Sequence, residues 1–437
     1  MKTQIFTSLK GAAVLALLTI PGLLKAQEGE KTQVANLRPY DKSGINVFEA
    51  PKEDLPFNGL KVKFGAGFTQ SFQGLKHENA SSDPANALYK IKPGFNTANA
   101  NLFMDVQLAD GIRLNLTSYL SSRHHNETWV KGGYIQFDKL PFNGKVWEDI
   151  MKVATLKVGH MEINYGDQHF RRSDGGQTIY NPFVENYILD AFTTEIGGEV
   201  YLRKDAVFGM IGASNGMIKG NIDELAPTPQ DDNTNKSPAI YLKGGVDKQL
   251  AEKLRVRVAA SYYTNSSSGS NTLYGGDRTG SNYFMVMEKA GGTYAANAFS
   301  GRLNPGFTKK VNAFQANGFV KAGGMEVFAT FEKANGRTKA ETAMRDVTQY
   351  AVEGVYRFGV SENLFVGARY NTVAAELAGI ADEVNINRAS FAAGWFLTPN
   401  ILLKGEYVNQ KYVDFPAADL RHDGKFNGYV IQAVVGF

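Results

Sequence analysis

Long stretches of this chain alternate between apolar and polar residues. The pattern is clearest in 97–108, where every second residue from Ala98 to Leu108 is apolar and most of the others are polar. The same alternation recurs in 60–72, 112–120, 253–263, 364–371 and 386–397. A period of two residues is typical of a β-strand with one apolar and one polar face. We therefore predict an all-β protein.

The chain ends on a strand of this kind. One apolar face of this strand is formed by Tyr429, Ile431, Ala433, Val435 and Phe437. In water such a face would promote aggregation, whereas in a membrane it meets lipid and the strand can pair with the first strand to close a barrel. The ending resembles the last strand of outer-membrane β-barrels, which implies that Tyr429 and Phe437 form the signal read by the outer-membrane assembly machinery. An edge strand of a soluble β protein is the alternative.

The beginning of the chain has the features of a secretory signal peptide. Lys2 and Lys10 form a basic region, an apolar stretch covers 11–24, and Ala26 precedes the expected cleavage site. The apolar stretch is shorter than the roughly 20 residues that a spanning helix needs. We expect residues 1–26 to be removed on export.

The connections between the strands predict the architecture of the rest of the chain. They are alternately short and long, as in a transmembrane, antiparallel, up-and-down β-barrel with short periplasmic turns and long external loops. Counting 265–310 as one loop gives 16 strands, and an extra hairpin inside it would give 18. We expect 27–54 to be a polar, flexible periplasmic N-terminal segment and 55–437 to be the barrel, with a short helix from 139–152 in its periplasmic mouth.

Composition excludes several other classes of protein. The chain has no cysteine, so it has neither disulfides nor thiolate metal sites. The formal charge of +4 falls to +1 when the signal peptide is removed with its three lysines, so the charge gives no argument for binding nucleic acid. His124 and His125 are adjacent, but no spacing of ligands predicts a metal site and no serine, histidine and acid form a catalytic pattern. We predict no enzyme activity, no catalytic residue, no metal and no cofactor.

One long connection, 164–189, is dense in charged, glycine and aromatic residues. By the strand count it is the third external loop. Charges around a constriction determine the selectivity of a pore. The candidate selectivity residues are therefore Asp167, His169, Arg171, Arg172, Asp174 and Glu185. Arginine suits contact with carboxylate or phosphate groups; in the alternative, both arginines pair with acids and hold the loop against the wall.

The polar faces of the strands would line the lumen. The candidate wall cations are Lys61, Lys63, Arg113, Lys157, Arg255, Arg257, Arg369 and Arg388. Basic residues slightly outnumber acids on these faces, which indicates a weak preference for anions. Most of these charges are expected to neutralise one another.

The loop and the strand after it carry a family resemblance. Gly166–Asp174 and the aromatic, glycine-rich Phe192–Tyr201 are similar to segments of porins, most of all of the phosphate-selective porin O and P superfamily. The resemblance implies an outer-membrane channel, surrounded by lipid, that admits small hydrophilic solutes or anions by passive diffusion through a constriction at 164–189. It also implies a homotrimer. The lysine-rich ladders of phosphate-specific members are missing from this chain.

A second function fits the same architecture. The loop 265–310 carries the aromatic residues Tyr274, Tyr283, Phe284, Tyr294 and Phe299, which suit the binding of a partner or a surface glycan, and 411–425 is a further candidate loop. On this hypothesis the barrel is a structural or docking component rather than an open channel.

Overall fold

The computed structural model describes residues 34–437, except 51, 54, 55, 143, 221 and 223. The predicted signal peptide lies outside the described residues. All strands within them belong to one antiparallel sheet. They are β1 (Lys61–Glu78), β2 (Gly94–Phe95), β3 (Asn99–Ala109), β4 (Ile112–Leu120), β5 (Trp129–Phe137), β6 (Ala154–Glu162), β7 (Thr194–Lys204), β8 (Val207–Ser214), β9 (Ala239–Ala251), β10 (Leu254–Asn265), β11 (Lys310–Ala322), β12 (Met325–Arg337), β13 (Arg345–Phe358), β14 (Leu364–Ala375), β15 (Val384–Thr398), β16 (Ile401–Val413) and β17 (Lys425–Gly436).

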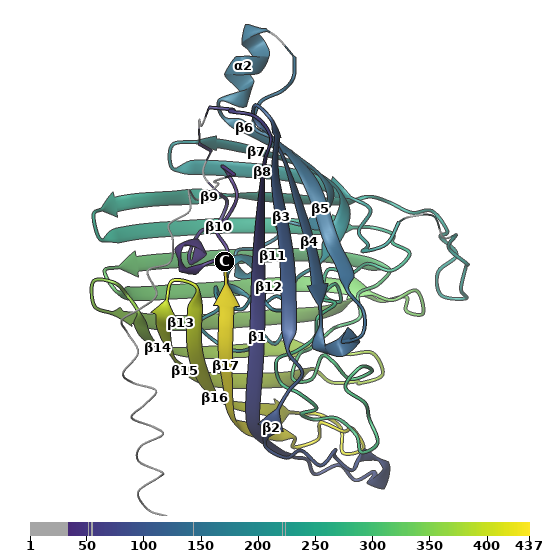
Figure 1. Ribbon diagram of the computed structural model, residues 1–437. Helices are drawn as coiled ribbons and strands as arrows, with labels where there is room; N and C mark the ends of the chain where they lie inside the picture. Colours follow the sequence, from purple (N-terminus) through teal and green to yellow (C-terminus); the bar gives the residue numbers. More distant parts are fainter. Residues whose placement is uncertain (1–33, 51, 54–55, 143, 221, 223) are drawn as a thin grey trace, which may run out of the picture. The chain divides into compact units, whose positions relative to one another are not determined.

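All of these strands except β2 form a closed barrel (Figure 1). Each pairs with the next along the chain, and β17 returns to pair with β1 from Gly67 opposite Gly436 to Glu78 opposite Lys425. The two-residue β2 is an addition to β1 within the first long loop. The predicted barrel of 16 strands is therefore confirmed. The extra hairpin that would have raised the number to 18 does not form in 265–310.

The alternation of the sequence places apolar side chains on the outside of the barrel. On β15, Phe391 and Trp395 are 61% and 45% exposed, whereas Arg388 and Ser390, which alternate with them, are buried inside. A closed barrel satisfies its backbone hydrogen bonds between strands, so its apolar outer face can meet lipid. The height of the wall is uneven: β3–β8 have 8–11 residues each and β9–β17 have 12–15.

The longest connection at the short-turn end contains helix α2 (Lys145–Met151), between β5 and β6. The helix projects from the rim of the barrel (Figure 1), and its residues are exposed apart from Met151. A helix was expected here, but its expected position in the mouth of the barrel is wrong. No helix among the described residues is long and apolar enough to cross a membrane.

Residues 34–50 occupy the mouth instead. Tyr40 stacks on Phe103 of β3 with 3.9 Å between ring centroids, and Phe48 packs against Phe319 of β11. A short 3-10 helix, η1 (Lys42–Gly44), lies between them, and the Lys42 N–H donates to the Pro399 carbonyl in the turn after β15. The sequence pattern predicted a flexible periplasmic segment here. It is a packed part of the lumen because two aromatic side chains anchor its polar backbone to opposite walls.

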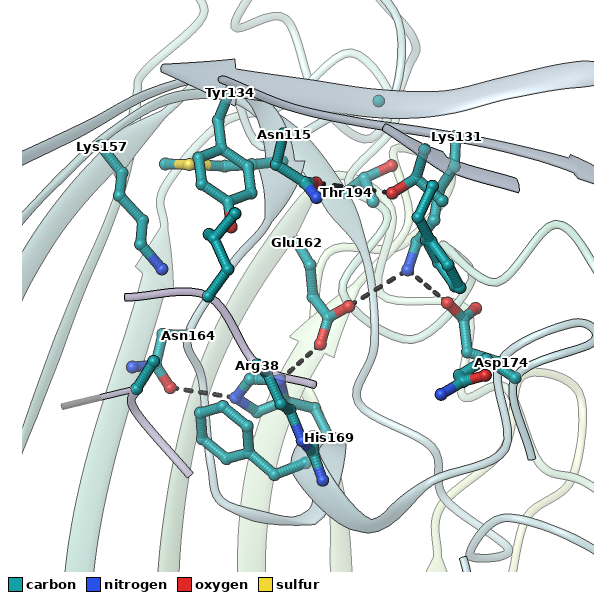
Figure 2. Close-up of a pocket in the computed structure, with 18 of the residues that line it drawn as sticks. Arg38, Asn115, Lys131, Tyr134, Lys157, Glu162, Asn164, His169, Asp174 and Thr194 are labelled. Carbon is teal, nitrogen blue, oxygen red and sulfur yellow. Dashed lines mark hydrogen bonds and ion pairs between the residues drawn. The ribbon is translucent and has the colours of Figure 1, made fainter. Parts of the chain in front are cut away.

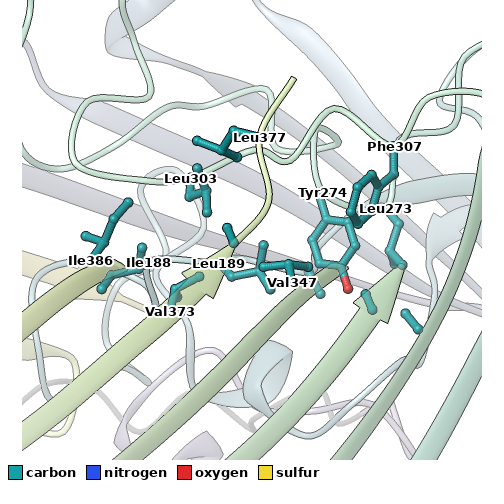
Figure 3. Packing of buried hydrophobic residues seen from close by; sticks show 14 of the residues in the cluster. Ile188, Leu189, Leu273, Tyr274, Leu303, Phe307, Val347, Val373, Leu377 and Ile386 are labelled. Carbon is teal, nitrogen blue, oxygen red and sulfur yellow. The ribbon is translucent and has the colours of Figure 1, made fainter. Parts of the chain in front are cut away.

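The outer half of the lumen contains a hydrophobic core. Ile188 and Leu189 from the third loop and Leu273 and Phe307 from the loop 265–310 pack against inward-facing apolar residues of the wall (Figure 3). The wall residues include Val347, Val373 and Ile386. Two loops therefore fold into the barrel, which removes their apolar side chains from water.

The last residue takes part in closing the barrel. The Phe437 N–H donates to the Ala66 carbonyl at 3.0 Å and the Phe437 carbonyl accepts from the Ala66 N–H at 2.9 Å. We expect Phe437→Ala to keep these bonds but to lower the yield of folded barrel in the outer membrane, measured by heat-modifiable gel migration, because it removes the aromatic end that the sequence predicts to be an assembly signal. Phe391→Ala, which removes a comparably exposed ring from the middle of the wall, is the control. Equal yields of the two variants would contradict this role.

Candidate functional site

The third external loop, 163–193 in the structure, folds into the lumen. Almost all of its residues are buried, including Arg171 and Arg172 and the acids Asp167 and Glu185. A 3-10 helix, η4 (Gln168–Arg171), lies near its start, and the rest of the loop consists of turns and irregular chain inside the lumen. A buried loop leaves backbone N–H and carbonyl groups that need partners inside the protein.

Polar side chains of the wall provide those partners. Asn317 of β11, Gln349 of β13, Asn371 of β14 and Glu406 of β16 accept hydrogen bonds of 2.7–3.0 Å from loop N–H groups. Lys404 of β16 donates to the carbonyls of Thr178, Asn181 and Phe183, each at 2.8 Å. The polar inner face of the barrel therefore acts here as a hydrogen-bonding surface for the loop.

Asp167 lies in a buried network of charges at one end of the loop. Arg257 of β10 donates two hydrogen bonds to its carboxylate, at 2.7 and 2.8 Å, and Lys243 of β9 lies 2.7 Å away. Both cations also pair with Glu49 of the N-terminal segment. Burial alone would raise the pKa of Asp167, but Lys243 and Arg257 lower it, so Asp167 is ionised.

Arg171 and Arg172 point to different partners. Arg171 pairs with Glu353 of β13 at 2.8 Å and with Glu326 of β12 at 3.6 Å. Arg172 lies 3.3 Å from Asp174 in the loop itself. The sequence left open whether these arginines face a pore or hold the loop in place; in the structure, both guanidinium groups are buried in ion pairs.

A second arginine completes the network around Arg172. Arg172 lies 2.7 Å from Asp190 and 2.8 Å from Asp277, and Arg302 pairs with both of these acids and with Glu185. Burial alone would raise the pKa values of Asp277 and Glu185, but the arginines lower both below their ordinary values. These contacts link the third loop to the loop 265–310.

His169 lies beside a further buried ion pair. Its ring nitrogens contact Glu162 of β6 and Asn164, and Glu162 also pairs with Lys131 of β5 at 3.2 Å (Figure 2). Lys131 also pairs with Asp174. Burial lowers the pKa of His169 despite Glu162, so its ring is neutral at pH 7.

These residues line a cavity of about 230 Å³ between the loop, the N-terminal segment and the wall from β3 to β7 (Figure 2). Of the predicted selectivity residues, His169, Arg172 and Asp174 line it, and Asp167, Arg171 and Glu185 do not. The loop makes its hydrogen bonds and ion pairs mainly with β9–β17, β1 and β3. The space that remains is therefore on the side of the shorter strands.

Two cations of this cavity lack a carboxylate partner among the described residues. Lys157 of β6 places its ammonium 5.1 and 4.9 Å from the ring centroids of Tyr134 and Tyr201. Arg38 of the N-terminal segment stacks over Tyr180, with its guanidinium carbon 3.6 Å from the ring centroid, and burial lowers its pKa to about 10, so it stays charged at pH 7. Sequence reasoning named Lys157 but missed Arg38, because 27–54 has no periodicity; the isolated aromatics Tyr40 and Phe48 were the available signal.

Most of the other predicted wall cations are engaged elsewhere. Arg113 pairs with Asp138, Arg255 with Asp247 and Arg369 with Glu353. Arg388 donates to Gln410 and to the carbonyls of Asn186 and Gly301. Lys63 lies over the ring of Tyr40, and Lys61 is the first residue of β1. No group of three or more histidines and acids in the described part of the chain has the geometry of a metal site.

Comparisons with known proteins identify the fold. No family model matches the chain, and no curated protein sequence matches it. An anion-selective porin from Comamonas acidovorans is structurally similar with a TM-score of 0.54 and 8% identity, over 87% of this chain and 100% of that one. The outer-membrane protein OmpT of Vibrio cholerae without its loop L8 has a TM-score of 0.50 and 12% identity, over 86% of this chain and 99% of that one. The in-vitro folded trimer form of OmpT of Vibrio cholerae also has a TM-score of 0.50 and 12% identity, over 87% of this chain and 100% of that one.

At these identities the similarity concerns the fold. The closed barrel, its apolar outer face and these neighbours together place the chain among the multi-pass β-barrels of the outer membrane, and its architecture is that of outer-membrane porins and channels.

Proposed function

We propose that this barrel is a porin through which small hydrophilic solutes diffuse passively, with a weak preference for anions and with the loop 164–189 as its constriction. The observation that carries the proposal is the cavity beside the loop, where Lys157 and Arg38 have no carboxylate partner in the part of the chain that the structure describes. Fixed cations beside a narrow aqueous path raise the local concentration of anions and disfavour cations. The acids that line the same cavity are already paired: Glu162 and Asp174 with Lys131, and Glu49 with Lys243 and Arg257.

The experiment is single-channel conductance of the refolded protein in planar bilayers, with the reversal potential measured in a salt gradient. Stable conductance steps and an anionic reversal potential support the proposal. We expect Lys157→Glu to abolish or invert the preference for anions, because it reverses a charge that faces tyrosine rings and pairs with no carboxylate of the described residues. Lys339→Glu makes the same change on an exposed side chain of the connection between β12 and β13 and is the matched control. An unchanged reversal potential in Lys157→Glu would contradict the proposal that ions pass Lys157 of β6.

The proposal concerns anions in general rather than phosphate alone. The resemblance to the phosphate-selective porins rests on Gly166–Asp174, but the two arginines of this segment are paired with acids of the protein. A homotrimer is the assembly we propose, supported by the trimer form of the similar OmpT barrel. Cross-linking of the protein in outer membranes tests it.

A docking function is the second candidate. It is favoured by the filling of the lumen, because residues 34–50, the third loop and parts of 265–310 all pack inside the barrel. Of the aromatics that suggested docking, Tyr274, Tyr283 and Phe284 are buried, whereas Phe299 is 37% exposed. A correctly folded barrel that gives no conductance steps would favour this function over the porin.

A further inference from the structure

Helix α2 has an apolar and a polar face. A helix advances about 100° per residue, which places Val146, Trp147, Ile150 and Met151 on one side and Lys145, Glu148, Asp149 and Lys152 on the other. Met151 is buried against the barrel, whereas Val146, Trp147 and Ile150 are 69%, 47% and 43% exposed. The chain just before the helix enlarges this face, since the Phe142 ring lies 6.4 Å from that of Trp147 and is 61% exposed. We call Phe142, Val146, Trp147 and Ile150 the apolar patch.

The apolar patch adjoins the lipid-facing surface of the barrel. Helix α2 joins the short-turn ends of β5 and β6, where Phe137 is opposite Leu156 and Ile135 is opposite Val158. Ile135 and Val158 are 39% and 56% exposed on the outer face that lipid covers. Because Met151 packs at the end of β6, the patch begins where the lipid-facing surface of these strands ends.

The composition of the helix matches this location. Tryptophan favours the boundary between headgroups and acyl chains, and phenylalanine is common on the apolar side of segments that lie there. A helix that lies in this boundary has an apolar face toward the acyl chains and a charged face toward water. On the polar face of α2, Lys152 pairs with Asp149 at 2.6 Å, so these charges remain solvated when the other face is covered.

We propose that α2 lies in the periplasmic boundary of the outer membrane, with the apolar patch inserted among the phospholipids of the inner leaflet. The partner is therefore the lipid surface itself. The helix anchors the short-turn rim at the side of the shorter strands β3–β8. This role is independent of whether the lumen conducts.

The test uses the fluorescence of Trp147 in the full-length mature barrel, refolded into phosphatidylcholine vesicles. Trp129→Phe and Trp395→Phe together leave Trp147 as the sole tryptophan. We expect its emission to be quenched by phosphatidylcholine brominated near the headgroup end of the acyl chains, and to be protected from aqueous iodide. A variant that keeps only Trp395, which lies 45% exposed on the lipid-facing side of β15, is the positive control for lipid quenching.

A second variant separates insertion from simple proximity. Val146→Glu with Ile150→Glu retains Trp147 but makes the patch charged, and we expect brominated lipid to quench it less and iodide to quench it more. Heat-modifiable migration verifies that each variant is folded. Iodide quenching of Trp147 in the unmodified helix would overturn the proposal in favour of a water-exposed helix. Protection from both quenchers would overturn it in favour of a contact with another protein or a second copy.

Discussion

Arg172→Leu is expected to release the third loop from the lumen and to lower the free energy of unfolding by about 3–5 kcal/mol, the usual result of removing one member of a buried ion pair. The substitution leaves Asp190 and Asp277 with Arg302 as their remaining cationic partner among the described residues. The measurements are unfolding of the refolded barrel in urea and single-channel conductance, which should become larger and noisier. Arg172→Lys keeps the charge but loses the planar fork, so it should have a smaller effect.

The same network predicts the response to acid. Arg172 and Arg302 lower the pKa of Asp277 against the effect of burial. A carboxyl whose pKa is lower in the folded state contributes its full stability above its unfolded pKa of about 4, and loses it as the pH falls through the lower folded value. The wild-type loop should therefore stay in place at mildly acidic pH, and Arg172→Leu should open at a higher pH. Wild-type stability and conductance in Arg172→Leu would show that the network does not hold the loop.

Deletion of residues 34–50 is expected to raise the conductance several-fold and to weaken the preference for anions. The deletion empties the short-turn mouth and removes Arg38 from the cavity. The barrel should still fold, because the cations that lose Glu49 retain other ion pairs. Arg257 still pairs with Asp167 and Asp247, and Lys243 still pairs with Asp167. Refolding in vitro and heat-modifiable migration confirm that the variant closes.

A graded variant controls for this deletion. Tyr40→Ala removes the stack on Phe103 but keeps the segment, so its conductance should lie between those of the wild type and the deletion. If the deletion variant folds and conducts like the wild type, the path does not pass the N-terminal segment. The proposed cavity would then be a closed pocket.

The barrel was predictable from the sequence because the two-residue period of the strand is visible in many of the strands. In Ala98–Leu108 and in the final strand, apolar residues that face lipid alternate with residues that face the lumen. The alternation of short and long connections then determines the number of strands. The pattern weakens where Val347, Val373 and Ile386 face inward. Those positions are apolar because loops, rather than water, cover them.

The candidate site was predictable only in part. The charge-rich composition identified the third loop, but the partners of its arginines lie up to 182 residues away, as for Arg171 and Glu353. No local pattern relates such residues. Arg38 could not be found by periodicity because its segment forms neither a regular helix nor a strand, and its position depends on the aromatic contacts of Tyr40 and Phe48.

The hydrogen bonds that hold the third loop also have a consequence for the order of folding. Its backbone bonds to side chains of many strands, including β11 and β16, with donor and acceptor up to 226 residues apart. Contacts so distant in sequence form slowly because the chain between them must first be organised. The loop should therefore settle only after the late strands have joined β1. The time at which the loop becomes resistant to protease during refolding would then report when the barrel has closed.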